Sequence, residues 1–294
     1  MAESRKCQVL VIGAGPGGYV AGIRSAQLGL DTIVVEGDKA GGTCLIRGCI
    51  PSKAIIHAAE RFESLRQHSA DGGHMGLSVK GEAEVDMVGL VSWKDSIVDR
   101  LNKGVEGLLK AAGADLIKGW ARFEGPKSCI IDSGAGSVKI EAENVIIATG
   151  SSHIDLPFMP CDEEFVISST GALDLEALPK SVAIVGGGYI GLELGCALAK
   201  LGSKITVVEG MSSVLAIMDK EIRRPLEIWL KKHKVTVHTD SLARGVEIKG
   251  RGASKKAELT FEKDGTEHKV KVDKVLVTVG RKPNTKGWGL ENTG

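Results

Sequence analysis

The stretch QVLVIGAGPGGYVAGIRSAQLGLDTIVVEG, residues 8–37, decides the fold, because it recurs without a gap as SVAIVGGGYIGLELGCALAKLGSKITVVEG at residues 181–210. Each copy has an apolar strand, a G-x-G-x-x-G loop, a helix that ends at Leu-Gly, and a second strand that ends V-V-E-G. A strand, a glycine loop, a helix and a following acidic residue are typical of dinucleotide-binding sites. The repeat therefore predicts an α/β protein with two doubly wound, Rossmann-like domains.

Each part of the motif has a chemical reason. The first glycine allows a tight turn, the second lets the backbone approach a pyrophosphate, and the third lets the helix pack on the strand. The helix N-terminus presents unpaired N–H groups to the phosphates. The alternative is a glycine-rich turn without a ligand. The predicted cofactor-binding residues are Gly13, Gly15, Gly18 and Glu36 in the first copy, and Gly186, Gly188, Gly191 and Glu209 in the second.

The acidic residue also bears on the choice of cofactor. It accepts hydrogen bonds from a ribose 2′-hydroxyl, and its charge would repel a 2′-phosphate. Because the second copy carries Glu209 at this position, we expect the second site to prefer NAD to NADP.

The composition argues against several other classes of protein. The length of 294 residues suggests about two domains. The 38 basic residues are balanced by 37 acidic ones, so there is no cationic excess for nucleic acid or an anionic membrane. No apolar run approaches the roughly 18 residues of a membrane span, and the N-terminus has no signal-peptide core. We expect a cytoplasmic protein with neither nucleic acid nor membrane as a partner.

The remaining sequence reads as two helical and two strand-rich segments. Residues 52–67 predict a helix and residues 87–112 a long one, whereas 115–149 and 235–280 predict short strands with turns. The apolar face of the long helix is predicted to carry Trp93, Ile97, Leu101, Val105 and Leu108.

The segment GGTCLIRGCIPSK, residues 41–53, places Cys44 and Cys49 five positions apart. Such a pair in a reducing compartment is usually catalytic or metal-binding. In a regular helix these positions are roughly 8.7 Å apart, whereas a disulfide needs about 4.4–6.8 Å between Cα atoms. A bond would therefore need a distorted turn, for which Gly48 gives freedom. A helix start and Arg47 would lower the pKa of a thiol here.

Two other interpretations of this pair stay open. Zinc would need further ligands at suitable spacing, and no second pair of Cys or His residues appears. The cysteines could instead be inert packing residues. The flanking dinucleotide motifs favour a redox-active pair, and we predict no metal site. The other cysteines are predicted to be packing residues, and the histidines structural or solvent-facing: Cys7, Cys129, Cys161 and Cys196; His57, His68, His74, His153, His233, His238 and His268.

The motifs taken together point to a family. AGPGGYVA at residues 14–21, the cysteine segment, IIATGS at 146–151, GGGYIGLELG at 186–195 and VTVGRKPNTKG at 277–287 follow one another over the chain. In this order they resemble the flavin- and NAD-dependent pyridine nucleotide-disulfide oxidoreductases, in particular the dihydrolipoamide dehydrogenases. The sequence departs from that pattern at Ile46-Arg47, where a cation stands beside the pair.

The resemblance implies that the first motif holds FAD and the second NAD. It implies that Cys49 lies against the flavin, that Cys44 exchanges with the substrate, and that Lys53 near the flavin ring pairs with Glu193. Further cofactor contacts are implied for Glu36, Gly42, Thr43, Lys53, Thr149 and Gly150 on the FAD side, and for Tyr189, Ile190, Gly280 and Arg281 on the NAD side.

The same resemblance implies the activity and the partner. Dihydrolipoamide on the lipoyl domain of a 2-oxoacid dehydrogenase complex acyltransferase would be oxidised through a Cys44–Cys49 disulfide and FAD, with NAD reduced. An FAD-binding domain is expected at residues 1–152 and 283–294, and an NAD-binding domain at 153–282. The family's C-terminal interface domain, with its His-Glu dyad and homodimer contacts, is expected to be absent from these 294 residues.

Two alternatives follow from that absence. One is a fragment that binds both nucleotides and has at most NADH diaphorase activity. The other is a nucleotide-binding scaffold without catalysis.

Overall fold

The computed structural model describes residues 3–69, 75–134 and 136–294, and the chain divides into two compact units. The first unit comprises residues 1–51, 95–152 and 282–294, and the second comprises residues 52–94 and 153–281. Residues 52–94 thus belong to the second unit, whereas the sequence analysis assigned them to the first domain. The unit boundaries fall within helices α3 (Cys49–Ser69) and α4 (Met87–Ala112).

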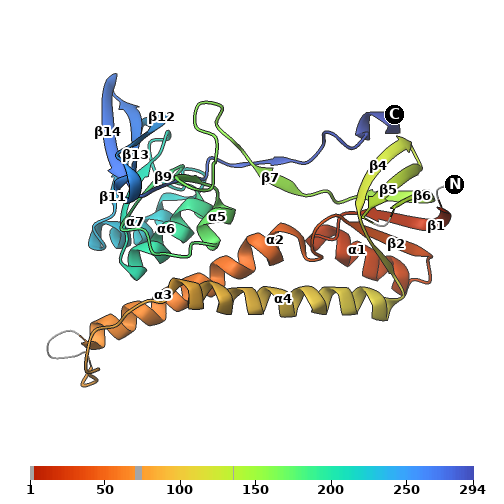
Figure 1. Cartoon of the computed structure of the whole chain (residues 1–294), viewed down its shortest axis with the longest axis horizontal. Helices are drawn as coiled ribbons and strands as arrows, with labels where there is room; N and C mark the ends of the chain where they lie inside the picture. The colour runs from red at the N-terminus through yellow and green to blue at the C-terminus, as the bar shows by residue number, and fades with distance from the viewer. Residues whose placement is uncertain (1–2, 70–74, 135) are drawn as a thin grey trace. The chain divides into compact units, whose positions relative to one another are not determined.

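The first unit is built on a six-stranded sheet in the order β3-β2-β1-β6-β5-β4. Figure 1 labels β1, β2, β4, β5 and β6 of this sheet. The neighbouring strands β3, β2, β1 and β6 pair in parallel. Strands β6, β5 and β4 form an antiparallel meander. The elements are β1 (Glu3–Ile12), α1 (Pro16–Gln27), β2 (Thr32–Glu36), α2 (Gly42–Arg47), β3 (Asp115–Lys118), β4 (Trp120–Gly125), β5 (Ser128–Ser133), β6 (Gly136–Ile147) and η2 (Leu290–Thr293).

Strand β1 forms the centre of this sheet because both of its faces are apolar. Leu10 and Ile12 pack into one hydrophobic cluster, whereas Val9 and Val11 pack into another. A continuous apolar run of this kind is typical of a parallel strand covered on both sides. Pro16 then starts α1, since its fixed φ suits the first helical position.

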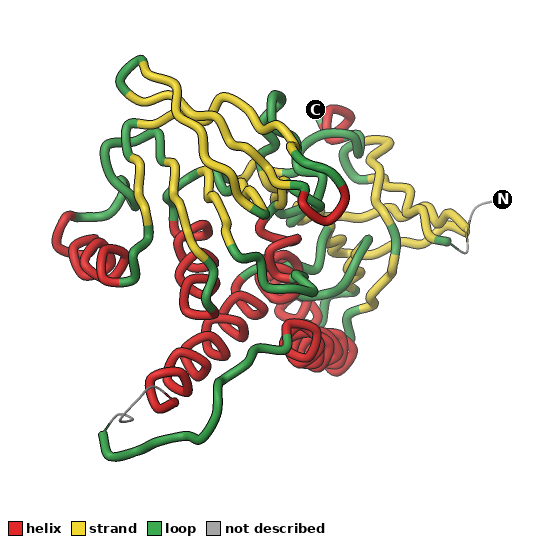
Figure 2. The backbone as a smooth tube through the Cα atoms, turned by 60° about the vertical axis from the view of Figure 1, so that its left-hand side comes forward, coloured by secondary structure: helices red, strands yellow, loops and turns green. Residues whose placement is uncertain are grey.

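The second unit repeats this plan with a parallel five-stranded sheet in the order β11-β10-β9-β15-β8. A separate antiparallel sheet contains β12, β13 and β14, and Figure 2 draws such strands in yellow. The elements are β8 (Val166–Ile167), α5 (Ser169–Leu173), β9 (Ser181–Val185), α6 (Tyr189–Leu201), β10 (Lys204–Val208), α7 (Lys220–Lys232), β11 (Thr236–His238), β12 (Ser241–Lys249), η1 (Gly252–Ser254), β13 (Lys256–Lys263), β14 (Thr266–Val272) and β15 (Lys274–Val277).

The chain is therefore an α/β protein with two doubly wound, Rossmann-like units, each with a strand-rich meander. The second is inserted between parts of the first, as predicted. The segments that connect them include β7 (Ser151–His153) and β16 (Arg281–Pro283), which pair with each other. The helices predicted at 52–67 and 87–112 and both strand-rich segments are present. Within the described residues, no helix has the length and hydropathy needed to cross a bilayer.

The apolar face predicted for α4 is only partly buried, since Val105 lies in the core. Trp93, Leu101 and Leu108 are exposed, whereas Lys94 and Asn102 are buried together with Val98, Val105 and Leu109. These two polar side chains tolerate burial because each has a partner. Lys94 Nζ lies 2.5 Å from Asp174 Oδ1, and Asn102 Nδ2 donates to the carbonyl oxygen of Ala40 at 2.7 Å. The buried side of α4 therefore includes Lys94 and Asn102, which a search for apolar periodicity would assign to the exposed side.

Candidate functional site

The three motif glycines after β1 have different surroundings. Gly13 has φ +97°, and a methyl group there would lie 2.3 Å from the carbonyl oxygen of Ala148. A methyl group at Gly18 would lie 1.7 Å from the carbonyl oxygen of Gly13. At Gly15 the nearest atom would be Gly42 Cα, at 3.7 Å. The outer glycines are thus required by packing, and the middle one leaves the backbone approachable.

The glycines of the second motif also differ in the space around them. Gly186 has φ +102°, and a methyl group there would lie 2.6 Å from the carbonyl oxygen of Thr278. A methyl group at Gly191 would lie 2.6 Å from the carbonyl oxygen of Gly186. A methyl group at Gly188 would have no described atom within 4 Å. Both loops therefore have an open middle glycine at the start of a helix, which is the arrangement that suits a pyrophosphate.

The two motif glutamates are held against their loops by backbone N–H groups. Glu36 accepts hydrogen bonds from the N–H groups of Ala14 at 2.8 Å and Asp38 at 2.9 Å. Glu209 accepts from the N–H groups of Gly187 at 2.5 Å and Met211 at 2.7 Å. Each carboxylate is thereby fixed at the end of the second strand of its motif, where a ribose would bind.

Burial raises the pKa of the Glu36 carboxyl, and the hydrogen bond from Ala14 and the charge of Arg47 oppose this shift. Arg47 also forms an ion pair with Asp38. The guanidinium group of Arg47, which the sequence places beside the cysteine pair, thus binds a carboxylate just after the end of β2.

The start of α2 lies on the first glycine loop. The N–H of Gly41 donates to the carbonyl oxygen of Ala14 at 2.7 Å. Gly42 has φ +58°, and a methyl group there would lie 2.5 Å from Gly15 Cα. A side chain at Gly42 would therefore force the two segments apart. This contact places Thr43, the second residue of α2, near the same loop.

Thr149 and Gly150 are fixed by a residue that the sequence analysis did not single out. Thr149 Oγ1 donates to the carbonyl oxygen of Asn284 at 2.8 Å, and Asn284 Nδ2 donates to the carbonyl oxygen of Thr149 at 2.9 Å. The N–H of Asn284 donates to the carbonyl oxygen of Gly150 at 3.0 Å. Trp288 Nε1 donates to the carbonyl oxygen of Asn284 at 3.1 Å. The sequence feature that could have pointed to Asn284 is its position within the VTVGRKPNTKG motif.

The cysteine pair spans a break between two helices. Cys44 lies in α2, which ends at Arg47, and Cys49 is the first residue of α3. Gly48 between them has φ −143° and ψ −112°, outside the helical range. A methyl group at Gly48 would lie 2.7 Å from the carbonyl oxygen of Thr43. The distorted turn that a disulfide would need is therefore present, and Cys44 is partly buried while Cys49 is exposed.

Lys53, which was predicted near the flavin, and the residues predicted on the NAD side all lie in the second unit. Lys53 Nζ lies 2.8 Å from both carboxylate oxygens of Glu193 in α6, so the expected ion pair is present. Tyr189 opens α6 with 57% of its surface exposed, and Ile190 follows it. The carbonyl oxygen of Gly280 accepts from the N–H of Ile154 at 3.1 Å, and Arg281 begins β16.

The remaining cysteines lie in or against the hydrophobic cores, which agrees with the prediction that they pack. Cys7 and Cys129 are buried in the core of the first unit, and Cys161 and Cys196 pack against the cores of the second. Burial raises the pKa of Cys7 and Cys196 to about 11, and that of Cys129 and Cys161 to about 12. Such thiols carry little thiolate at neutral pH, so they are poor nucleophiles.

Comparison with known proteins identifies the family. The family described as pyridine nucleotide-disulphide oxidoreductase matches residues 7–294. Dihydrolipoyl dehydrogenase from Pseudomonas aeruginosa is 44% identical over 295 residues, covering 100% of this chain and 61% of that protein. LpdA from Mycobacterium tuberculosis has a similar structure, with a TM-score of 0.85 and 27% identity over 98% of this chain and 61% of that one. The flavoprotein disulfide reductase RclA from Escherichia coli has a TM-score of 0.79 and 26% identity, over 97% and 59%.

The chain thus spans about three fifths of the length of these relatives, as the 61% coverage of the P. aeruginosa protein shows. The matched region, residues 7–294, contains both glycine loops and the cysteine segment. The chain belongs to the pyridine nucleotide-disulphide oxidoreductase family.

Proposed function

We propose that the chain forms the FAD- and NAD-binding part of a disulfide oxidoreductase of the dihydrolipoyl dehydrogenase type. The observation that carries the proposal is the equivalence of the two glycine loops, each with an open middle glycine and a glutamate held by two backbone N–H groups. A second feature, the Cys44–Cys49 segment, begins directly on the first loop. A single nucleotide-binding fold would explain one such loop but not a pair with a dithiol beside it.

The residues that would hold FAD are those of the first unit. The N–H groups at the start of α1 and the open backbone of Gly15 suit the pyrophosphate. The carboxylate of Glu36 suits the adenosine ribose, and Thr149-Gly150 would contact the flavin nucleotide. In the second unit, Gly188 and Glu209 suit NAD in the same way. When bound, FAD and NAD supply two-electron transfer between a dithiol and a pyridine nucleotide.

The chemistry assigned to this chain's own residues is thiol–disulfide exchange. A substrate dithiol attacks Cys44 Sγ of the oxidised pair, and the Cys44–Cys49 bond breaks. The second substrate thiol then attacks the mixed disulfide. The substrate leaves as a disulfide, Cys44 and Cys49 are left as thiols, and two electrons and two protons have moved to the protein. Gly48 serves this step, since it lets the chain bend between the two sulfur-bearing residues.

Lys53 is proposed as the cation that favours negative charge on the reduced isoalloxazine. It lies four residues after Cys49 on α3, so both side chains project from the same side of the helix. Glu193 fixes the Lys53 ammonium group through two contacts of 2.8 Å. In this arrangement Glu193 is a positioning residue, because it would act through Lys53.

The lipoyl substrate and partner rest on the relatives. Dihydrolipoyl dehydrogenases from P. aeruginosa and Bacillus subtilis are each 44% identical to this chain. We therefore propose dihydrolipoamide, carried by the lipoyl domain of a 2-oxoacid dehydrogenase complex, as the dithiol.

The proposal is tested on the purified chain by visible spectroscopy during anaerobic addition of NADH. We expect a flavin spectrum that is bleached by NADH and a long-wavelength band from thiolate next to flavin. The Cys49→Ser variant should keep the flavin and lose that band, and the Cys196→Ser control should keep both. A protein that binds no FAD when FAD is supplied would overturn the proposal and favour a scaffold without catalysis.

The second candidate is a flavin-dependent NADH diaphorase, which the two glycine loops alone would support. It requires neither cysteine of the pair. NADH-dependent reduction of an artificial acceptor should survive in Cys44→Ser and Cys49→Ser, whereas lipoamide reduction should be lost in both. Retention of lipoamide reduction in these variants would refute the role of the pair.

A further inference from the structure

Three side chains with metal-binding atoms meet at the beginning of the inserted part of the second unit. His153 is the last residue of β7, and Asp155 lies two positions later. Alternate residues of an extended chain project to the same side, so His153 and Asp155 face one way. The chain then returns through a bridge between Leu156 and Met159, and this return brings Cys161 back to the same place.

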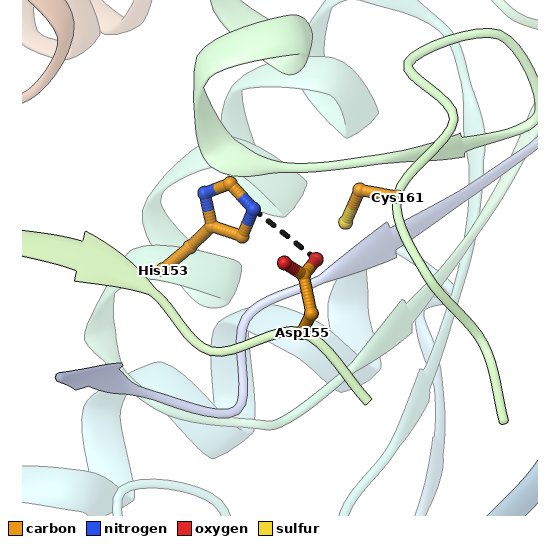
Figure 3. A group of neighbouring side chains, drawn as sticks. All are labelled: His153, Asp155 and Cys161. Carbon is orange, nitrogen blue, oxygen red and sulfur yellow. Dashed lines mark ion pairs between the residues drawn. The ribbon is translucent and has the colours of Figure 1, made fainter. Parts of the chain in front are cut away.

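The geometry of this group is compact. The ligand atoms of His153, Asp155 and Cys161 all lie within 4.8 Å of one another, and His153 Nε2 lies 3.2 Å from Asp155 Oδ1. Figure 3 shows that the imidazole, the carboxylate and the thiol point toward one another from two passes of the chain. Donor atoms about 2.0–2.3 Å from a common ion, as at zinc sites, lie roughly 3–4 Å apart. Small side-chain rotations would therefore bring all three onto one ion.

The donor atoms also define the kind of ion. An imidazole nitrogen, a carboxylate oxygen and a thiolate sulfur together suit zinc, which accepts all three, better than magnesium or calcium, which take oxygen ligands. The surroundings are anionic. Asp155 is itself a proposed ligand, and Asp162 and Glu163 follow Cys161 directly in the chain. Bound cation charge would offset this accumulation of negative charge and displace the thiol proton.

We propose that His153, Asp155 and Cys161 form a binding site for one Zn²⁺ ion, with the fourth position left to water. Three protein ligands and one water are a common zinc coordination. His153 and Asp155 keep 35% and 49% of their side chains exposed, so the ion has access from solvent. This site is separate from the cysteine pair and does not depend on the function proposed above.

The site would tie the end of β7 to the segment that leads into β8. Met159 and Val166 of this segment are buried in the core of the second unit. Because the ligands come from both passes of the chain, bound metal would favour the folded arrangement. Any ion that binds only the folded state stabilises it by mass action, by about 2.7 kcal/mol at 100 times the dissociation constant.

The test uses Co²⁺ as a spectroscopic probe for Zn²⁺ on the whole chain after treatment with a chelator. A thiolate–Co²⁺ bond gives a charge-transfer band in the near ultraviolet, and zinc should displace it at one equivalent. We expect this band in the parent and in Cys196→Ser, which removes another half-buried thiol of the same unit. It should be lost in Cys161→Ser, and His153→Gln and Asp155→Asn should each weaken binding at least about tenfold.

The cysteine pair could bind Co²⁺ as well, so the titration is repeated in a Cys44→Ser/Cys49→Ser background. The proposal requires the band to remain there with a stoichiometry of one ion per chain. If Cys161→Ser does not fold, which circular dichroism reports, the exposed Asp155→Asn substitution still decides the matter. A band that is absent from the background variant, or binding unchanged in Asp155→Asn, would overturn the proposal.

Discussion

Lys53 and Glu193 meet in a bidentate ion pair, with the Lys53 ammonium 2.8 Å from each oxygen of the Glu193 carboxylate. The two residues are 140 positions apart in sequence. Their side chains are 57% and 38% exposed. Ion pairs at such exposure contribute little to stability, because water screens the attraction. The pair therefore contributes little to holding the fold, and its effect on a reaction is the role proposed above.

Lys53→Gln should slow the reduction of bound flavin by NADH about tenfold or more, since it removes a charge that favours the reduced state. The thermal midpoint should move by no more than about 2 °C. Rapid-mixing absorbance and a thermal scan measure the two effects. Arg244→Gln is the control, because it removes an exposed ion pair with Glu262 in the three-stranded sheet. An unchanged reduction rate in Lys53→Gln would contradict the proposed role.

Gly188→Ala should weaken NADH binding at least about tenfold without destabilising the protein. The added methyl group has room, yet it would occupy the face by which the pyrophosphate approaches the backbone. Calorimetric titration with NADH and a thermal scan separate the two effects. Gly245→Ala, in β12, also adds a methyl group in open space and should change neither. If Gly188→Ala bound NADH with unchanged affinity, the nucleotide would have to bind at another place.

Gly18→Ala should lower the stability of the first unit. Its methyl group would lie 1.7 Å from the carbonyl oxygen of Gly13. Overpacking against backbone costs about 3 kcal/mol or more, which corresponds to a fall in the thermal midpoint of about 5 °C or more. The neighbouring Gly17→Ala has open space and gains helix propensity, so it should be neutral or slightly stabilising. Equal midpoints for the two variants would be inconsistent with the packing described.

Asp273→Asn should destabilise the second unit in a pH-dependent way. Burial alone would raise the pKa of this carboxyl, but hydrogen bonds from Lys256 and from Ser181 lower it below its usual value of 3.8. A lowered folded pKa gives stability that is present above the unfolded pKa and is lost as the pH falls through the folded pKa. We expect a loss of about 1–3 kcal/mol at pH 7.

Urea midpoints of Asp273→Asn and the parent should therefore differ at pH 7 and converge below about pH 4, as the parent carboxyl is protonated. Asp264→Asn is the matched control, because Asp264 is exposed in the turn between β13 and β14. It should leave the midpoint nearly unchanged. A gap between Asp273→Asn and the parent that stays constant down to pH 3 would argue against an ionised, hydrogen-bonded Asp273.

The sequence allowed prediction of the features that are local in the chain. The repeat at residues 8–37 and 181–210 predicted both loops, because strand, turn and helix follow one another there. Helix geometry also predicted that a disulfide between Cys44 and Cys49 would need a distorted turn, for which Gly48 gives freedom. These predictions needed no knowledge of distant contacts.

The features that were missed depend on partners far away in sequence. Lys94 can be buried because it forms an ion pair with Asp174, 80 positions away. Asn102 can be buried because it donates a hydrogen bond to the carbonyl oxygen of Ala40, 62 positions away. Periodicity alone assigns such polar residues to the exposed face. The prediction that His153 is structural or solvent-facing stays a prediction, and the metal site proposed at this residue could not be read from the spacing of its side chains along the chain. Cys161 reaches His153 only through the return of the chain at Leu156 and Met159.

The two glycine loops have nearly the same backbone but unlike neighbours. A methyl group at Gly15 would approach Gly42 Cα at 3.7 Å, whereas one at Gly188 would approach no atom of the described residues within 4 Å. The start of α2 thus borders the first loop, and the corresponding side of the second is open. We expect the first nucleotide to have a long residence time and to behave as a prosthetic group, and the second to exchange with the cellular pool in every catalytic cycle. One duplicated motif would then provide both a permanent and a diffusible redox carrier.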